Sequence, residues 1–349
     1  MKIRITTLLL TLLCLVSCKK EMLFPIASGR PYEVLVVMDR NMWEKRDAGR
    51  SLFDVLDTDV PGLPQSERSF RISHCTPNEL DNTLRLFRNV ITVDIDPHVY
   101  TRTKLKFVRD KFAMEQIWIT IQSPSEEEFA DYCKKNRQFI VDFLTKTEMN
   151  RLIKILEEKH SKVSLDLAKE VFKCEIWAPE ELTSFKKADH FIWTSNNTAS
   201  GMVSLCIYSY PYFGPETFTK QYAIAKRDSV MMRNIPGETP GMYMHTDSAC
   251  TMAKTISVHG QYAYELRGLW YVENDAMGGP FVSHSRVDTT RNLVIVAEGF
   301  VYAPEKMKRG LMRRMEGALY TLMLPAELAA KDTKPVADEK SDTAAADSI

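Results

Sequence analysis

The sequence lacks the short motifs by which common enzyme classes are recognised. The patterns G-x-S-x-G, H-E-x-x-H, G-x-x-x-x-G-K-S/T and G-x-G-x-x-G occur nowhere in its 349 residues. These patterns provide a serine nucleophile, a zinc site, a phosphate-binding loop and a dinucleotide-binding turn. We therefore expect none of these enzyme classes, and we predict neither a cofactor nor a metal.

An excess of charge of one sign is also missing. The chain carries 46 basic and 46 acidic side chains, so its formal net charge is zero. Domains that bind nucleic acids need a basic surplus or a basic stripe to neutralise phosphates. Because this sequence has neither, nucleic acid is not an expected partner.

The first residues have the layout of a secretion signal. Two cations precede an apolar stretch, residues 5–16, and Ser17 and Cys18 follow. An apolar stretch of about a dozen residues is too short to cross a bilayer, which takes ~20, but it is typical of a signal peptide. Loss of the predicted signal peptide, residues 1–17, would leave 44 basic and 46 acidic side chains, a net charge of −2.

The end of this signal, Leu15-Val16-Ser17-Cys18, resembles the lipobox of bacterial lipoproteins, in which the cysteine thiol is acylated, commonly with palmitate, and the chain is cut before it. An ordinary signal peptide with an incidental cysteine is the alternative. Each lipid CH₂ buried in a bilayer contributes ~0.8 kcal/mol, so several acyl chains would hold the protein at a membrane. We therefore expect lipidation of Cys18, with the membrane as the partner of that lipid.

The residues after Cys18 bear on which membrane this would be. Lys19 stands where an Asp in enteric bacteria retains lipoproteins at the inner membrane. The resemblance therefore implies the outer membrane, and we favour its periplasmic face. Surface exposure, which some bacteria direct with an acidic run, is the alternative that Glu21 leaves open.

The cysteines of the body favour free thiols. Apart from Cys14, which would leave with the signal, and Cys18, five remain: Cys75, Cys133, Cys174, Cys206 and Cys250. Their number is odd, their spacing is irregular and no C-x-x-C occurs, which argues against a disulfide framework or a metal site. We expect buried free cysteines, a common kind of core residue.

Hydrophobic patterning predicts an α+β fold of two packed halves, with mixed or antiparallel sheets covered by helices. A tether, residues 18–30, precedes an N-terminal α/β half at 31–160 and a C-terminal α+β half at 161–325. The Ala-, Asp-, Lys-, Thr- and Ser-rich tail at 326–349 has almost no large apolar side chain, so we predict that it is disordered. The sequence leaves open whether the two halves arose by duplication.

Several elements are specific enough to test. A capping box at Ser125 and Glu128 predicts a helix over 126–146. In the C-terminal half we predict short helical structure near 179–185, a meander of three strands, and a final helix from about residue 305. The strands are expected at 262–272, 281–287 and 293–302, with Gly278-Gly279-Pro280 and 288–292 as the chain reversals.

A further helix is expected after Gly214-Pro215-Glu216, ending at Ile235-Pro236-Gly237. Its inward-facing side chains would be Phe218, Tyr222, Ala225, Ser229 and Met232.

Two sets of residues are candidates for chemistry or binding. A hydrolytic triad needs a nucleophile, a base and an orienting carboxylate close together, and the nearest candidates for the base and the carboxylate are His245, Asp247 and His284. Exposed loop histidines are the competing interpretation. Adjacent Gly278 and Gly279 could admit a ligand to backbone amides, although a tight strand connection explains them equally well.

Aromatic residues cluster in the second half, and such clusters can line a sugar or peptide groove. They are Tyr208, Tyr210, Tyr212 and Phe213, then Tyr262, Tyr264, Trp270 and Tyr271. Alternation along strands would bury about half of them. We take Trp270 and Tyr271, beside the double glycine, as the candidate ligand contacts.

Several segments together carry a resemblance over nearly all of the mature chain. They are Gly29-Arg30-Pro31-Tyr32-Glu33-Val34, Lys226-Arg227-Asp228-Ser229-Val230, Arg267-Gly268-Leu269-Trp270, Gly278-Gly279-Pro280-Phe281-Val282 and Gly299-Phe300-Val301-Tyr302-Ala303-Pro304. With the lipobox, they resemble an uncharacterised family of bacterial lipoproteins catalogued as a domain of unknown function. This resemblance implies no activity. We therefore expect a lipid-anchored binding or scaffold protein of the cell envelope, whose partner is an envelope protein or a glycan, with an envelope hydrolase as the alternative.

Overall fold

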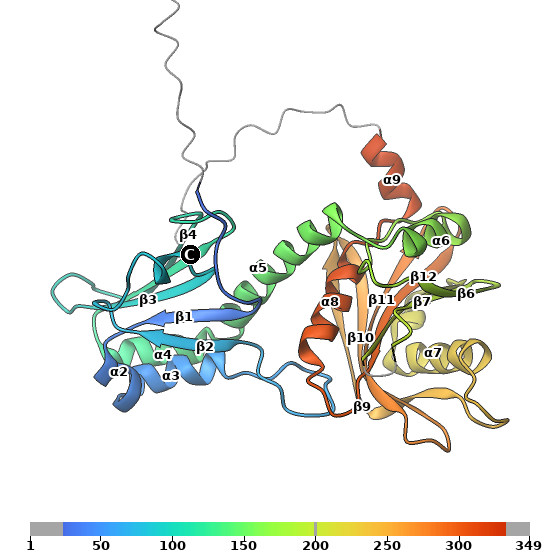
Figure 1. The fold of residues 1–349 in the computed structure, drawn as a ribbon, viewed down its shortest axis with the longest axis horizontal. Helices are drawn as coiled ribbons and strands as arrows, with labels where there is room; N and C mark the ends of the chain where they lie inside the picture. The colour runs from blue at the N-terminus through green and yellow to red at the C-terminus, as the bar shows by residue number, and fades with distance from the viewer. Residues whose placement is uncertain (1–23, 199–200, 333–349) are drawn as a thin grey trace, which may run out of the picture.

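The computed structural model describes residues 24–198 and 201–332, which form two halves, each built around its own β-sheet (Figure 1). The predicted signal peptide, Cys18, the first part of the tether and most of the predicted tail lie outside the described residues. Within them, the predicted α+β fold is confirmed, with one mixed and one antiparallel sheet flanked by helices.

The N-terminal sheet has the strand order β2-β1-β3-β5-β4. All pairings are parallel except that of β4, which runs antiparallel to β5 at the edge. The central strands are apolar because they are covered on both faces. The strands are β1 (Glu33–Val37), β2 (Arg71–Cys75), β3 (Asn89–Ile95), β4 (Lys104–Arg109) and β5 (Ile117–Ser123).

One face of this sheet is covered by helices and the other by loops. Leu52, Phe129 and Leu144 are buried from the helical side. The other face packs Trp118 and Val90 under a loop that contains the 3-10 turn η1 (Leu84–Leu86). The helices are α2 (Arg40–Lys45), α3 (Asp47–Leu56), α4 (Glu126–Lys135) and α5 (Arg137–Glu158).

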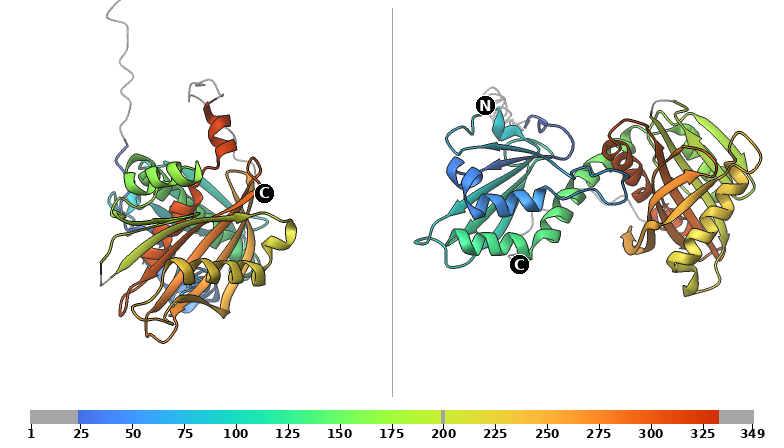
Figure 2. Two further views of the ribbon diagram at one scale, coloured as in Figure 1. Left: turned by 90° about the vertical axis from the view of Figure 1, so that its right-hand side faces the viewer. Right: turned by 90° about the horizontal axis from the view of Figure 1, so that it is seen from below.

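The C-terminal sheet is antiparallel throughout, with the order β6-β7-β8-β12-β11-β10-β9. Helix α7 covers one face, and α8 lies on the other, toward the N-terminal half (Figures 1 and 2). The two sheets differ in topology, so the halves are not copies of one fold. The strands are β6 (Ser184–Ala188), β7 (Phe191–Ser195), β8 (Met202–Pro211), β9 (Met244–Val258), β10 (Gln261–Val272), β11 (Gly278–Asp288) and β12 (Leu293–Tyr302). The helices are α6 (Lys162–Phe172), η2 (Pro215–Phe218), α7 (Lys220–Asn234), α8 (Arg309–Tyr320) and α9 (Pro325–Asp332).

Helix α5 joins the two halves. Its 22 residues begin under the N-terminal sheet, and its later turns pack against α8 (Figure 1). Gly317 of α8 makes the close approach possible, because a Cβ there would lie 2.5 Å from Cδ2 of Leu152 on α5. The halves are therefore in direct helix-to-helix contact.

A loop of the N-terminal half makes the second junction. Glu67, which is 2% exposed, accepts the backbone N–H groups of Lys308 at 2.7 Å and Arg309 at 2.8 Å. Helix α8 has no side-chain cap of its own at Lys308. A carboxylate from 241 residues earlier therefore caps its positive end.

Some predicted elements differ in the structure. The helix predicted over 126–146 is two helices, because the chain turns at Asn136, whose side-chain amide donates to the carbonyl of Tyr132. The helical structure predicted at 179–185 is wrong, since a turn there leads into β6. The three strands of the predicted meander are confirmed as β10, β11 and β12, and the predicted final helix is confirmed as α8.

Two predictions about the C-terminal half need correction. The first reversal of the meander lies at residues 273–277, and Gly278-Gly279-Pro280 belongs to β11 itself. The predicted disordered tail begins with a helix, α9, because Glu327 accepts the N–H of Leu324 and forms an ion pair with buried Arg286. The remainder of the tail, 333–349, lies outside the described residues.

The inner face predicted for the helix after Gly214 is only partly right. Ala225, Ser229 and Met232 are exposed, whereas Ala223, Arg227, Met231 and Asn234 are buried. Apolar periodicity gave the wrong rotation of α7, because one of the two residues of this helix that are 0% exposed is a cation, Arg227.

Candidate functional site

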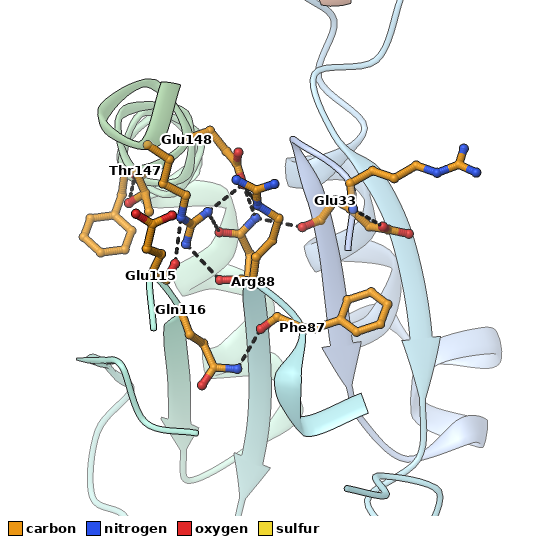
Figure 3. Close-up of polar contacts among 11 residues, drawn as sticks. Glu33, Phe87, Arg88, Glu115, Gln116, Thr147 and Glu148 are labelled. Atoms are coloured by element: carbon orange, nitrogen blue, oxygen red, sulfur yellow. Dashed lines mark hydrogen bonds and ion pairs between the residues drawn. The ribbon is translucent and has the colours of Figure 1, made fainter. Parts of the chain in front are cut away.

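A closed polar cluster lies at the amino ends of β3 and β5, where α5 crosses them (Figure 3). Glu148 and Arg151 stand one helical turn apart, so both reach Asn89, the first residue of β3. Arg151 Nη1 lies 2.6 Å from Glu148 Oε1 and donates to Asn89 Oδ1 at 2.8 Å. The Asn89 amide donates to Glu148 at 2.7 Å and to the carbonyl of Glu33 at 2.7 Å.

The backbone completes this cluster. Arg151 donates through Nε to the carbonyl of Glu115 at 2.7 Å and through Nη2 to that of Arg88 at 2.9 Å. Arg88 Nε lies 3.0 Å from Glu148 Oε1, so one carboxylate faces two guanidinium groups. Buried charges are tolerated when paired and hydrogen-bonded in this way. The cluster clamps α5 to the sheet and leaves little polar capacity for a ligand.

Gln116 fixes the neighbouring loops (Figure 3). Its amide donates to the carbonyls of Arg85 at 2.6 Å and Phe87 at 2.7 Å, and its oxygen accepts the N–H of Phe112 at 3.0 Å. These contacts fix the loops around Gln116, which lines a hollow that opens to solvent.

This hollow, which we call the Ile26 hollow, has a volume of about 710 Å³. Three apolar side chains in it are unusually exposed: Ile26 at 72%, Ile155 at 57% and Met114 at 41%. Its charged lining is balanced, with Arg109, Arg151 and Lys154 against Asp110, Glu115 and Glu158. Its chemistry suits an amphipathic partner.

A second hollow of about 770 Å³ lies between α9 and the ends of β10 and β11. Arg286, Glu327 and His259 line it, but Arg286 is already paired with Glu327 and with the carbonyl of Leu322 at 2.8 Å. Burial lowers the pKa of His259. The charged groups here fasten α9 to the sheet.

Two further buried charge clusters flank the C-terminal sheet, and sequence patterns gave no sign of either. On the α7 side, Arg227 and Glu298 are both 0% exposed and lie 2.8 Å apart. Burial raises the pKa of Glu298 even though Arg227 opposes the shift. The guanidinium also lies over the ring of Phe281, 4.0 Å from its centroid.

On the α8 side, Arg267 links Glu265 of its own strand, at 3.1 Å, to Glu316 of α8. Arg313 pairs with Glu316 at 3.1 Å and lies over the ring of Tyr32 in the N-terminal half. Burial raises the pKa of Glu265, but nearby His284, with Nε2 3.6 Å away, and the charge of Arg267 outweigh it, so the net pKa is well below the usual range. This cluster holds the interface between the halves.

The structure does not bring the candidate triad residues together. His284 is fully buried, with Nε2 3.6 Å from Glu265 Oε2 and its ring edge-on to Tyr320. In the sheet, His284 pairs with Glu265 and His245 pairs with Tyr271, six residues further along β10. At ~3.3 Å per strand residue, His284 and His245 are ~20 Å apart.

His245 and Asp247 lie near each other on β9, an edge strand that the sequence interpretation took for a loop. His245 Nε2 is 3.0 Å from Glu273 Oε2. Asp247 accepts the N–H groups of Ala249 at 3.0 Å and Cys250 at 3.1 Å, and these bonds lower its pKa. Asp247 therefore stabilises an irregularity of the strand and does not orient an imidazole.

The candidate ligand contacts are mostly structural. A Cβ on Gly279 would lie 2.0 Å from the carbonyl oxygen of Val301, and one on Gly278 would lie 2.8 Å from that of Trp270. Close packing of strands therefore requires both glycines. Trp270 is 1% exposed and packs edge-on to Phe300, whereas Tyr271 is 41% exposed beside His245.

The aromatic residues predicted to line a groove also separate into buried and exposed side chains. Half of the eight residues are buried, namely Tyr208, Tyr210, Tyr264 and Trp270. Of the others, Tyr212, just after β8, and Tyr262, near the start of β10, contact Phe218 with ring centroids 5.9 and 5.2 Å away. The eight side chains do not form one binding surface.

The body cysteines are free: Cys75, Cys133, Cys174 and Cys206 are buried, and Cys250 is exposed. Burial raises the pKa of Cys133 to about 12. Among the described residues, no group of three or more His, Cys, Asp and Glu side chains is placed to hold a metal ion. Over the same part of the chain, no helix combines the length and apolarity needed to cross a membrane.

Together, the fold and clusters define a two-domain α+β protein whose buried charges serve its own packing. Residues 27–157 match the family model described as a domain of unknown function (DUF8532). Residues 161–321 match another, described as a domain of unknown function (DUF4837). The predicted resemblance to a family catalogued in this way is confirmed.

Other comparisons are more distant. No curated protein matches the chain. A crystal structure from Bacteroides thetaiotaomicron VPI-5482, determined at 1.50 Å resolution, aligns with 10% identity and a TM-score of 0.24 over 43% of this chain and 44% of that one. The alignment thus spans less than half of that protein.

Proposed function

We propose that this protein is a lipid-anchored component of the bacterial cell envelope that acts by binding or scaffolding. Lipid on Cys18 would hold it at the outer membrane, on the periplasmic face. Its partner would be an envelope protein or a glycan, bound by surface complementarity.

The observation that favours binding over envelope hydrolysis is the position of His284. A general base must reach the proton it removes, within about 3 Å or through one water. His284 is buried against Tyr320, ~20 Å along the sheet from His245, so the only predicted constellation offers no assembled site. The other titratable clusters are occupied by internal ion pairs.

The anchor is tested by replacing Cys18. We expect the mature protein to show the mass of an acylated amino terminus and to sediment with outer membranes. The Cys18→Ala variant should lose both the acyl mass and the membrane fraction, whereas Cys250→Ser, which removes an exposed thiol of the body, should change neither. Unchanged processing and sedimentation of Cys18→Ala would refute the anchor.

The side of the outer membrane on which the protein lies and its biochemical role need separate measurements. On the periplasmic face, the protein should resist protease added to intact cells and become sensitive once the outer membrane is permeabilised. For the role, purified protein should bind isolated envelope material without releasing soluble glycan or peptide fragments. Fragment release that His245→Ala abolishes would favour the hydrolase instead.

A further inference from the structure

We infer that the exposed apolar side chains around the Ile26 hollow form the surface by which the anchored protein rests on the lipid bilayer. The inference rests on the proposed lipidation of Cys18. The surface consists of Ile26, Met114 and Ile155, which line the hollow with Arg109 and Lys154, together with exposed Phe24, two residues before Ile26 in the chain. We call it the docking face.

The first argument is the gathering of apolar side chains in one exposed place. Ile26, Met114 and Ile155 come from the start of the chain, a loop before β5 and the last turns of α5, yet they line a single hollow. Apolar side chains that gather on a surface mark a contact with a protein or a membrane. The clamp of Arg151 and Glu148 underneath is already satisfied, so the hollow offers mainly apolar contact.

The second argument is that hydrogen bonds fix the position of residues 25–28, the segment that leads into the N-terminal half. Ala27 donates to the carbonyl of Met114 at 3.0 Å, and Met114 donates to that of Pro25 at 2.8 Å. Ser28 donates to the carbonyl of Leu86 at 2.7 Å. The docking face is therefore bonded to residues 25–27, which lie close to Cys18 in the sequence.

The third argument is the length of the connection. Phe24 is six residues after Cys18. Six residues span at most ~21 Å even when fully extended. The docking face therefore stays close to the bilayer that holds the lipid, and its contact with that bilayer is intramolecular. A patch too small to bind membranes alone can bind under these conditions, because the anchor supplies a high effective concentration.

The charges at the rim indicate the kind of bilayer contact. Cations and acids are equal in number around the hollow, so docking should not require anionic lipids. Lys154, whose side chain is 67% exposed and whose ammonium lies 3.9 Å from Glu115 Oε1, can lay its methylene stem on the apolar face and exchange this exposed pair for a lipid phosphate.

Site-specific fluorescence tests this inference. Acylated full-length protein in a Cys250→Ser background carries one environment-sensitive probe, attached at Ile155→Cys, and is incorporated into phosphatidylcholine vesicles. Met232→Cys is the matched control, because Met232 is 48% exposed and belongs to α7, the helix that covers the face of the C-terminal sheet opposite α8. The buried cysteines of the body should remain unlabelled.

We expect spin-labelled lipid to quench the Ile155→Cys probe several-fold more than the Met232→Cys probe, with a blue shift of its emission. Equal quenching of the two probes on vesicle-bound protein would overturn the docking face. It would leave the anchor intact and point to a protein partner for the hollow. Failure of the acylated protein to sediment with vesicles would instead refute the proposed anchor.

A second measurement avoids any probe. Amide hydrogen exchange of residues 111–116 should slow when the acylated protein is on vesicles. The double variant Ile26→Gln and Ile155→Gln should lose that protection, and Met232→Gln should keep it. Vesicle-dependent protection that survives the double variant would count against the docking face.

Discussion

The contact of Glu67 with helix α8 allows the coupling of the two halves to be measured. Glu67→Ala removes the acceptor of two backbone N–H groups and leaves without a partner the donor of Lys308, which is 5% exposed, and that of half-buried Arg309. Hydrogen bonds to a charged group contribute ~1.5–3 kcal/mol each, and loss of a helix cap costs ~0.5–2 kcal/mol. Because these terms overlap, we expect the free energy of unfolding to fall by ~2–4 kcal/mol.

Glu67→Gln retains one acceptor oxygen, so its loss should be about half of that for Glu67→Ala. Glu79→Gln is the matched control, because Glu79 forms an ion pair with Arg40 that is exposed to solvent, and such pairs contribute little to stability. Urea unfolding followed by tryptophan fluorescence measures all three, and Glu67→Ala should also broaden the transition as the halves begin to unfold separately. A loss below ~0.5 kcal/mol, the range of ordinary surface substitutions, would refute the assigned cap.

Three further predictions concern the C-terminal half. Arg227→Met or Glu298→Leu alone should cost ~3–5 kcal/mol in urea unfolding, while the two together should cost less than the sum of the single losses; additive losses would contradict the buried pair. Gly279→Ala should lower the free energy of unfolding by ~1–3 kcal/mol, because its methyl would lie 2.0 Å from a neighbouring carbonyl oxygen, whereas Gly310→Ala meets open space and should be neutral or stabilising. Burial lowers the pKa of His259 below 6.5, so the unfolded state binds the proton first and stability should fall as pH drops from 6.5 through the folded pKa. His259→Asn should flatten that dependence in thermal unfolding, and an unchanged profile would contradict it.

Some elements could be predicted because their side chains follow one simple rule. The strands of the meander alternate or run apolar, and Ser125 accepts the N–H of Glu128 at 3.2 Å as the capping box requires. The free state of the cysteines followed from their odd number and spacing. In these cases local sequence and tertiary packing agree.

Other elements could not be predicted from local sequence, because their positions depend on residues that are distant in the chain. The rotation of α7 is set by Arg227 meeting Glu298, 71 residues later. The strand β9 has few large apolar side chains, because it is the sheet edge. The helix α9 depends on Glu327 reaching buried Arg286. No periodicity reveals such pairings.

The candidate site shows the same limit. Proximity in sequence suggested His245 with Asp247, and these do lie near each other, but His284 is placed by strand register and α8. The double glycine was informative about close packing and not about a ligand. The Ile26 hollow arises only where three separate segments meet, so no motif could indicate it.

The strand order of the C-terminal sheet has a consequence for shortened chains. Strand β12 is the last to be synthesised, yet it lies between β8 and β11, in the interior of the sheet. A chain that stops between residues 288 and 293 would therefore lack β12, and its sheet would fall into two pieces, each with a newly exposed apolar edge. Loss of an outer strand would only make the sheet narrower. Such truncated products should aggregate or be degraded, and partial function should not survive in them.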